Sequence, residues 1–185
     1  MSKHITITGE LGSGKSTVAK LLAEQLDYSF FSTGDAHRML AQQMGITTLQ
    51  LNQKALTDRT IDDKIDDQIK KLAEEKTPFV IDSRLAFHFI PSSFKVMLTV
   101  APEVGAQRIM QARRSSESAY TSLQNCLKAN TNRRKMEQER FIKLYQVDIC
   151  DKKNFDLVID TTHQTPEEIA ENIIFQYKKL IPKHK

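Results

Sequence analysis

The chain has 185 residues, of which 39% are hydrophobic and 27% charged, and its formal net charge is +4. These values are typical of one globular domain with its own core and exclude a long disordered chain. No apolar run approaches the roughly 18 residues of a membrane-spanning helix, and two cysteines are too few for a disulfide framework. We expect a cytoplasmic monomer without a secretory signal. We also expect it to bind neither membrane nor nucleic acid, since its few aromatic residues do not interleave with its basic ones.

Five short segments rich in β-branched or aromatic residues predict strands. They cover residues 4–8, 28–32, 79–82, 95–100 and 155–160. Helical patterns at residues 15–26, 61–75, 102–113 and 165–180 separate or follow them. This alternation favours an α/β fold with a five-stranded parallel sheet and helices on both faces. We expect one domain over residues 1–185, with helical insertions at about residues 35–76 and 114–146.

Residues 9–16, between the first strand and the first helix, read GELGSGKS and match the phosphate-binding pattern GxxxxGK[ST]. In this loop, backbone N–H groups and the helix N-terminus surround phosphate oxygens. Lys15 can reach the β- and γ-phosphates of ATP, and the Ser16 hydroxyl can ligate Mg²⁺. The residues expected to bind ATP here are Gly9, Gly12, Ser13, Gly14, Lys15, Ser16 and Thr17.

A phosphate loop identifies a P-loop NTPase and leaves the reaction open. The chain has no [NT]KxD segment, which counts against a GTPase. No apolar run ends in DxxG or an Asp-Glu pair, which counts against a motor or pump-like ATPase. A small chain with this loop near its start favours a small-molecule kinase. Two alternatives remain, a kinase for a different acceptor and a nucleotide-binding regulatory protein with little turnover.

Polar residues follow the second and third predicted strands, at the edge where open α/β sheets bind ligands. Thr33 and Arg38 follow the second strand, and Asp82 and Arg84 end the third. Asp82 can orient Mg²⁺ or its waters. The forked donors of Arg84 can hold a phosphoryl group.

Arg133, Glu137 and Arg140 recur at the spacing of one helical face. One interpretation is a lid whose arginines neutralise the transferred phosphoryl group, with Glu137 accepting a hydrogen bond from an exocyclic amine such as cytosine N4. The other is an exposed ladder in which Glu137 pairs with both arginines. The sequence leaves both open.

In their order along the chain, these segments resemble the cytidylate kinases, especially the compact archaeal type. The matching positions are residues 9–17, Thr33, Gly34, Arg38, Ile61, Asp62, Ile65, Asp66, residues 82–86, Arg133, Glu137, Arg140, Phe141, Tyr145 and residues 155–161. The resemblance implies a nucleoside monophosphate (NMP) kinase fold. It also implies transfer of the ATP γ-phosphate to CMP or dCMP with Mg²⁺ as cofactor. Residues 35–76 would then bind the acceptor, and residues 114–146 would form the lid.

The resemblance also implies residue roles. Thr33, Arg38 and Arg84 would hold the acceptor nucleotide, and Glu137 would face cytosine. Arg108 would lie over the adenine of ATP. The residues implied in catalysis are Lys15, Arg133, Arg140 and Arg113.

The chain departs from the family pattern at several of these positions. Phe87 and Arg134 stand where the family often has glycine and an acidic residue. The family's Tyr-Gly-Ile-Asp stretch reads Tyr-Gln-Val-Asp at residues 145–148. Arg113 comes one residue later than the usual arginine, a shift of about 100° around a helix.

Overall fold

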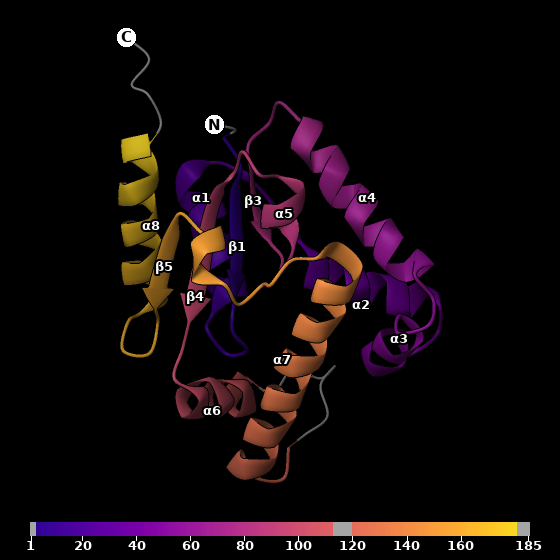
Figure 1. Cartoon of the computed structure of the whole chain (residues 1–185). Helices are drawn as coiled ribbons and strands as arrows, with labels where there is room; N and C mark the ends of the chain where they lie inside the picture. Colours follow the sequence, from indigo (N-terminus) through magenta and orange to yellow (C-terminus); the bar gives the residue numbers. More distant parts are fainter. Residues whose placement is uncertain (1–2, 113–119, 181–185) are drawn as a thin grey trace.

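Within residues 3–112 and 120–180, which the computed structural model describes, five parallel strands form one sheet of order β2-β3-β1-β4-β5 (Figure 1). The strands are β1 (Ile5–Gly9), β2 (Ser29–Ser32), β3 (Phe79–Asp82), β4 (Phe94–Thr99) and β5 (Leu157–Asp160). In the central register, Ile5 of β1 is opposite Val80 of β3 and Phe94 of β4. The predicted five-stranded parallel sheet is confirmed, and each strand lies within two residues of its predicted limits.

The remaining elements are helices. They are α1 (Lys15–Leu26), α2 (Thr33–Gln43), α3 (Thr48–Lys54), α4 (Thr60–Glu74), α5 (Ala86–Phe89), α6 (Pro102–Ala112), α7 (Leu123–Tyr145), the 3₁₀ helix η1 (Lys152–Asn154) and α8 (Pro166–Leu180). α1 and α8 pack together on one face of the sheet, and α5 covers the other with α4 outside it. None of the helices in the described ranges is long and apolar enough to cross a membrane.

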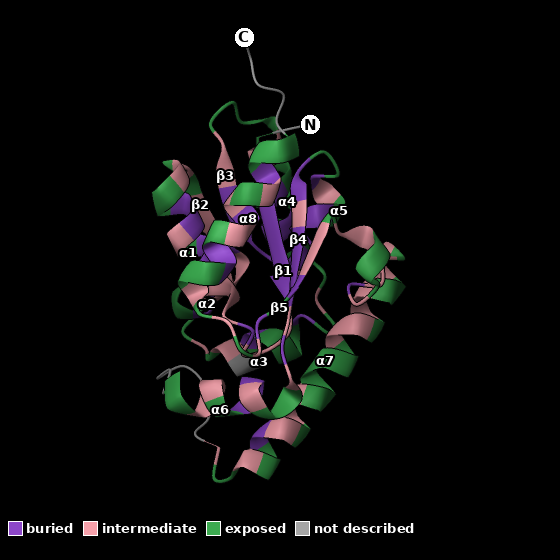
Figure 2. Cartoon of the chain, turned by 90° about the vertical axis from the view of Figure 1, so that its left-hand side faces the viewer, coloured by how far each residue is buried: buried purple, intermediate pink, exposed green. Residues whose placement is uncertain are grey.

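The main core lies between the sheet and the α1–α8 pair. Val18 and Leu22 of α1 and Ile169 and Ile173 of α8 are fully or almost fully buried against strand residues such as Ile7. Figure 2 shows the central strands buried and the outer sides of the helices exposed. Parallel strands with helices on both faces become continuous apolar runs, which is why the sequence predicted them well.

Two helical segments extend from the carboxyl edge of the sheet. α2, α3 and α4 occupy the predicted insertion at residues 35–76, and α7 occupies the described part of the insertion at residues 114–146. Ser122 begins α7 by accepting a hydrogen bond from the backbone of Asn125 at 3.2 Å. Gln146 ends it with a left-handed φ of 56°. α7 packs on α6 and also contacts α4 through Arg140 and Asp62, so it extends along the carboxyl edge of the sheet from α6 to α4.

Candidate active site

The phosphate loop joins β1 to α1 and packs against α6. Gly12 and Gly14 have φ values of 79° and 82°, which favour glycine. A Cβ on Gly12 would lie 2.2 Å from the carbonyl oxygen of Gly105 on α6. Because α6 approaches the loop this closely, no side chain fits at position 12. Among the described atoms, none lies within 4 Å of a Cβ built on Gly14. The loop therefore needs Gly12 for both packing and backbone conformation, and Gly14 for conformation alone.

Ser16 and Asp82 meet beside this loop. The Ser16 hydroxyl donates to Oδ2 of Asp82 at 2.5 Å, and Asp82 is buried at the end of β3. A hydroxyl and a carboxylate are hard oxygen ligands of the kind Mg²⁺ prefers, and Mg²⁺ usually keeps water and nucleotide phosphate as its other ligands. The two residues predicted as metal ligands are thus adjacent, and their donor set fits the ion.

Lys15 is a partly buried cation at the start of α1. Its ammonium donates to the carbonyl oxygen of Glu10 at 3.2 Å. Burial, together with the nearby charge of Arg84, lowers the pKa of Lys15 to about 8, although the carboxylates of Asp82 and Glu137 oppose this shift. The charge of Lys15 therefore depends on pH near neutrality.

Glu137 of α7 lies between two arginines beside Lys15. Its Oε2 is 2.7 Å from Nε of Arg84, and its Oε1 accepts from Nε of Arg133 at 2.9 Å. Arg84 also donates through Nη1 to the carbonyl oxygen of Gly9 at 3.0 Å. Burial alone would raise the pKa of Glu137, but the charges of Arg84 and Arg133 hold that pKa below its usual value. The cluster joins α7 to the phosphate loop.

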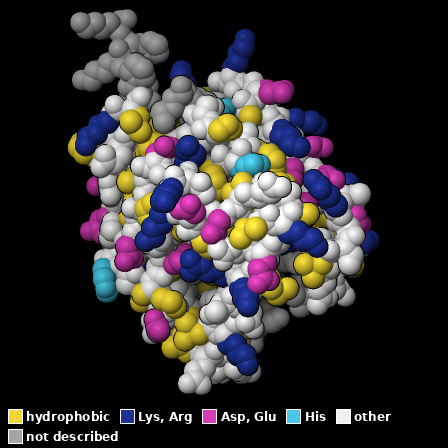
Figure 3. All heavy atoms as spheres, in the orientation of Figure 1, with side chains coloured by type: hydrophobic (Ala, Val, Ile, Leu, Met, Phe, Trp, Pro, Cys, Tyr) yellow, Lys and Arg dark blue, Asp and Glu magenta, His cyan; other side chains and the backbone are white. Residues whose placement is uncertain are grey.

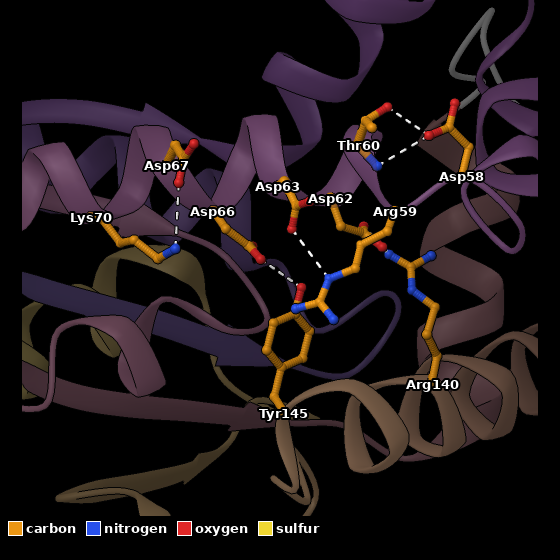
Figure 4. A network of polar contacts seen from close by, with 10 residues as sticks. All are labelled: Asp58, Arg59, Thr60, Asp62, Asp63, Asp66, Asp67, Lys70, Arg140 and Tyr145. Carbon is orange, nitrogen blue, oxygen red and sulfur yellow. Dashed lines mark hydrogen bonds and ion pairs between the residues drawn. The ribbon is translucent and has the colours of Figure 1, made fainter.

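Arg140 does not share Glu137 with Arg133, so the predicted ladder forms only in part. Its guanidinium instead pairs with Oδ1 of Asp62 on α4. One turn further along both helices, Tyr145 donates to Oδ2 of Asp66 at 2.5 Å (Figure 4). Arg140 does not join the ladder because α7 contacts α4 through Asp62, while Glu137 faces Arg84 after β3. Neighbouring side chains therefore turn to different partners.

Sequence reasoning assigned no site role to Asp62, Asp66 or Glu10. The sequence signal for Asp62 and Asp66 is that both match the family pattern and directly follow an apolar residue, and the structure shows both buried on α4. Glu10 accepts from the backbone of Val100 at 2.9 Å and pairs with Nη1 of Arg134 at 2.5 Å. Arg134, identified only as a departure from a family pattern, thus binds α7 to the phosphate loop.

The arginines of α7 accordingly face carboxylates. Arg133, Arg134 and Arg140 pair with Glu137, Glu10 and Asp62, respectively. On the face seen in Figure 3, basic side chains lie among acidic ones. Each arginine of α7 therefore has a carboxylate partner within the protein.

The other predicted residues lie around this cluster. The Thr33 hydroxyl donates to the carbonyl oxygen of Asp82 at 3.4 Å, and Arg38 pairs with Asp35 one turn earlier on α2. Arg108 of α6 donates to the carbonyl oxygen of Thr161, after β5, at 2.9 Å. Arg113 and the start of the predicted lid, through residue 119, lie outside the described residues.

Comparisons with known proteins show the family to which the chain belongs. Residues 4–163 match the model of the cytidylate kinase-like family. The chain is 36% identical over 173 residues to the cytidylate kinase of Sulfolobus acidocaldarius, covering 92% of this chain and 91% of that protein. It is 38% identical over 180 residues to the S-adenosylmethionine-dependent nucleotide dehydratase of Lacinutrix mariniflava. That match covers 97% of this chain but only 37% of the relative's length.

Solved structures share the fold at lower sequence identity. An uncharacterized protein from Eubacterium ventriosum has a TM-score of 0.72 at 21% identity, over 95% of this chain and 98% of that one. Shikimate kinase from Acinetobacter baumannii has a TM-score of 0.65 at 17% identity, over 98% and 97% of the two chains. At these identities the likeness shows the fold alone and no particular substrate.

Proposed function

The chain belongs to the cytidylate kinase-like family, and we propose that it transfers the γ-phosphate of ATP to CMP or dCMP. The main support is the cluster of Arg84, Glu137 and Arg133 beside Lys15. Phosphoryl transfer depends on positioning and on cations that neutralise the charge spread over the transferred group. Three cationic side chains from three elements meet here at the phosphate loop.

In this proposal, the loop from Gly9 to Thr17 holds the phosphates of ATP, and Arg108 lies near its adenine. Ser16 and Asp82 hold Mg²⁺, which when bound neutralises phosphate charge. Their contact at 2.5 Å places both oxygens at the loop.

The acceptor lies on the other side of the cluster. Thr33 and Arg38 of α2 and Arg84 after β3 hold its phosphate and sugar. Arg133, Arg140 and Arg113 complete the proposed catalytic set with Lys15.

The dehydratase name describes a relative that is much longer than this chain. Since the chain spans 37% of that protein, dehydration of a nucleotide is not carried over to it. The cytidylate kinase relatives, by contrast, match along most of their length, as the protein from Sulfolobus acidocaldarius does.

The test is an ADP-release assay with ATP, Mg²⁺ and a panel of acceptors that includes CMP, dCMP, UMP, AMP, shikimate and gluconate. We expect the highest kcat/KM with CMP or dCMP. A higher value with any other acceptor would establish a different kinase. ATP binding with no turnover on the panel would favour a nucleotide-binding regulatory protein.

A further inference from the structure

Glu10 is the second residue of the phosphate loop, and its carboxylate connects the loop to two other parts of the molecule. Oε2 accepts a hydrogen bond from the backbone N–H of Val100, directly after β4, at 2.9 Å. Oε1 lies 2.5 Å from Nη1 of Arg134 on α7. The Glu10 side chain is only 18% exposed, whereas that of Arg134 is 46% exposed. The carboxylate is therefore shielded and held by the core, and Arg134 reaches it from outside.

The main chain of Glu10 is fixed as well. Its N–H donates to the carbonyl oxygen of Leu98 at 2.9 Å. Its own carbonyl oxygen accepts from the N–H of Ser13 at 3.2 Å and from the Lys15 ammonium at 3.2 Å. A side chain held by such contacts keeps its partner within a narrow range of positions. Glu10 thus offers α7 a fixed contact inside the loop that is proposed to hold the phosphates of ATP.

Arg134 and Glu137 lie on one face of α7, which runs along the carboxyl edge of the sheet (Figure 1). They are three positions apart, about 4.5 Å along the helix axis. Arg134 contacts the phosphate loop, and Glu137 contacts Arg84 after β3. Two contacts from one face to different elements of the core fix both the rotation of the helix and its position along its axis.

This placement of α7 determines where Arg133 lies. Nε of Arg133 donates to Oε1 of Glu137 at 2.9 Å. Burial and then neighbouring charges, that of Arg133 among them, lower the pKa of Lys15, so this guanidinium lies close enough to act on the ammonium. Arg133 directly precedes Arg134 in the sequence, and a shift of α7 away from the loop would therefore move both.

We propose that Glu10 and Arg134 are positioning residues for phosphoryl transfer, because their ion pair holds α7 on the phosphate loop and so keeps Arg133 near the transferred group. The inference rests on the proposed function. Cations that neutralise the transferred group act only when they are already in place, and a displacement of about 1 Å can lower the rate about 100-fold. An acidic residue at position 134, as the family pattern often has, would repel Glu10. The pair is therefore particular to this chain.

Two substitutions remove the ion pair from either side. Glu10→Gln keeps an oxygen that can accept from the N–H of Val100, but it removes the negative charge that faces Arg134. Arg134→Gln removes the positive charge and leaves the contact of Glu10 with Val100. Arg134 also interacts with the Cys150 thiol, so the effects of the pair are those that both variants share.

The matched control is Lys135→Gln, at the next residue of α7. The Lys135 ammonium is 3.8 Å from Oε1 of Glu139, and these side chains are 75% and 65% exposed. Lys135→Gln therefore removes the same charge from the same helix, together with an ion pair, but leaves the contact between α7 and the phosphate loop.

We expect kcat for phosphoryl transfer from ATP to CMP to fall about tenfold or more in Glu10→Gln and in Arg134→Gln. The Kd of a non-hydrolysable ATP analogue should stay within about twofold of the wild-type value, and Lys135→Gln should keep the wild-type kcat. The double variant Glu10→Gln/Arg134→Gln should lose no more than the single variants, because both remove the same contact. Wild-type kcat in either single variant, losses that multiply in the double variant, or a loss confined to ATP affinity would overturn the inference.

Hydrogen exchange separates a failure of this inference from a failure of the proposed function. Without nucleotide, the backbone amides of α7 should exchange about threefold faster or more in Glu10→Gln and Arg134→Gln than in Lys135→Gln. Unchanged exchange in both variants would overturn the inference alone, whereas a wild type inactive with every acceptor would overturn the proposed function. Thermal unfolding of each variant confirms that folded proteins are compared, and we expect Glu10→Gln to unfold near the wild-type midpoint.

Discussion

The Glu137 carboxylate of α7 lies 2.7 Å from the Arg84 guanidinium after β3, and these side chains are only 21% and 18% exposed. The pair holds an anion among the cations of the phosphate site, beside Lys15 and Arg133. A nucleotide phosphate that binds Arg84 must compete with this carboxylate. Glu137 therefore has two opposing effects, since it positions the arginines and reduces the positive charge offered to phosphate.

Replacing Glu137 should separate these effects. We expect Glu137→Gln to bind a non-hydrolysable ATP analogue about three- to tenfold more tightly at low ionic strength, because a competing negative charge is lost. The kcat should fall, because Arg84 and Arg133 lose their common partner. Calorimetry and steady-state kinetics measure the two effects. Glu171→Gln on the exposed side of α8 is the matched control, and weaker binding in Glu137→Gln would contradict this account.

Lys15→Ala should abolish turnover with little effect on folding. Lys15 is a partly buried charge in the phosphate loop, so in the proposed reaction its loss should reduce kcat about 100-fold or more, as for other preorganised charges. The thermal midpoint should be unchanged or higher, since burial of this cation is unfavourable. Lys20→Ala, on the exposed side of α1, controls for loss of a lysine. Activity within a few-fold of wild type would exclude Lys15 from the reaction.

Nucleotide affinity should depend on pH through Lys15. The pKa of Lys15 is lowered to about 8, and bound phosphate favours its charged form, so binding raises this pKa. Affinity for the ATP analogue should thus be level below pH 8 and fall about tenfold per unit well above it. Lys15→Arg keeps its charge and should remove this fall. A wild-type profile that is flat to pH 9.5 would disprove the link.

The contact of Tyr145 with Asp66 should contribute to stability. Tyr145→Phe leaves the buried Asp66 carboxylate without this donor, and we expect a loss of about 1–3 kcal/mol in the free energy of unfolding. Urea unfolding measures it. The loss in the double variant Tyr145→Phe/Asp66→Asn should be smaller than the sum of the losses in the two single variants. Simple additivity would indicate that the two side chains act independently.

Local patterns explain what the sequence predicted well. The buried strands, the GELGSGKS loop and the helical pattern at residues 165–180 each depend on residues that are close together in the sequence. The position of Asp82 within reach of the phosphate loop also followed, because the carboxyl ends of parallel strands meet at one edge. The contact of Arg84 with Glu137 was not predicted, because Glu137 lies on α7 and not at the end of a strand.

The pairings of Arg140 and Arg134 required the packing of α7 and could not be predicted. On a helix, Arg140 and Arg133 are both near Glu137, so spacing alone allowed one ladder that joins all three side chains, as well as a lid. The structure adds α4 on one side of α7, and Asp62 then takes Arg140. Glu10 lay within a motif read for its glycines and lysine, so its side chain received no prediction.

Gly12 of the phosphate loop packs closely against Gly105 of α6, which is distant in the sequence. A Cβ on Gly105 would lie 2.7 Å from the carbonyl oxygen of Leu11, so the two backbones meet with no side chain between them. Position 105 therefore has no room for a side chain, as is also true of Gly12, although position 105 lies outside the GxxxxGK[ST] motif. A variant with even a methyl group there would have to separate α6 from the loop. We expect such a variant to bind nucleotide more weakly, even though residue 105 need not touch the nucleotide.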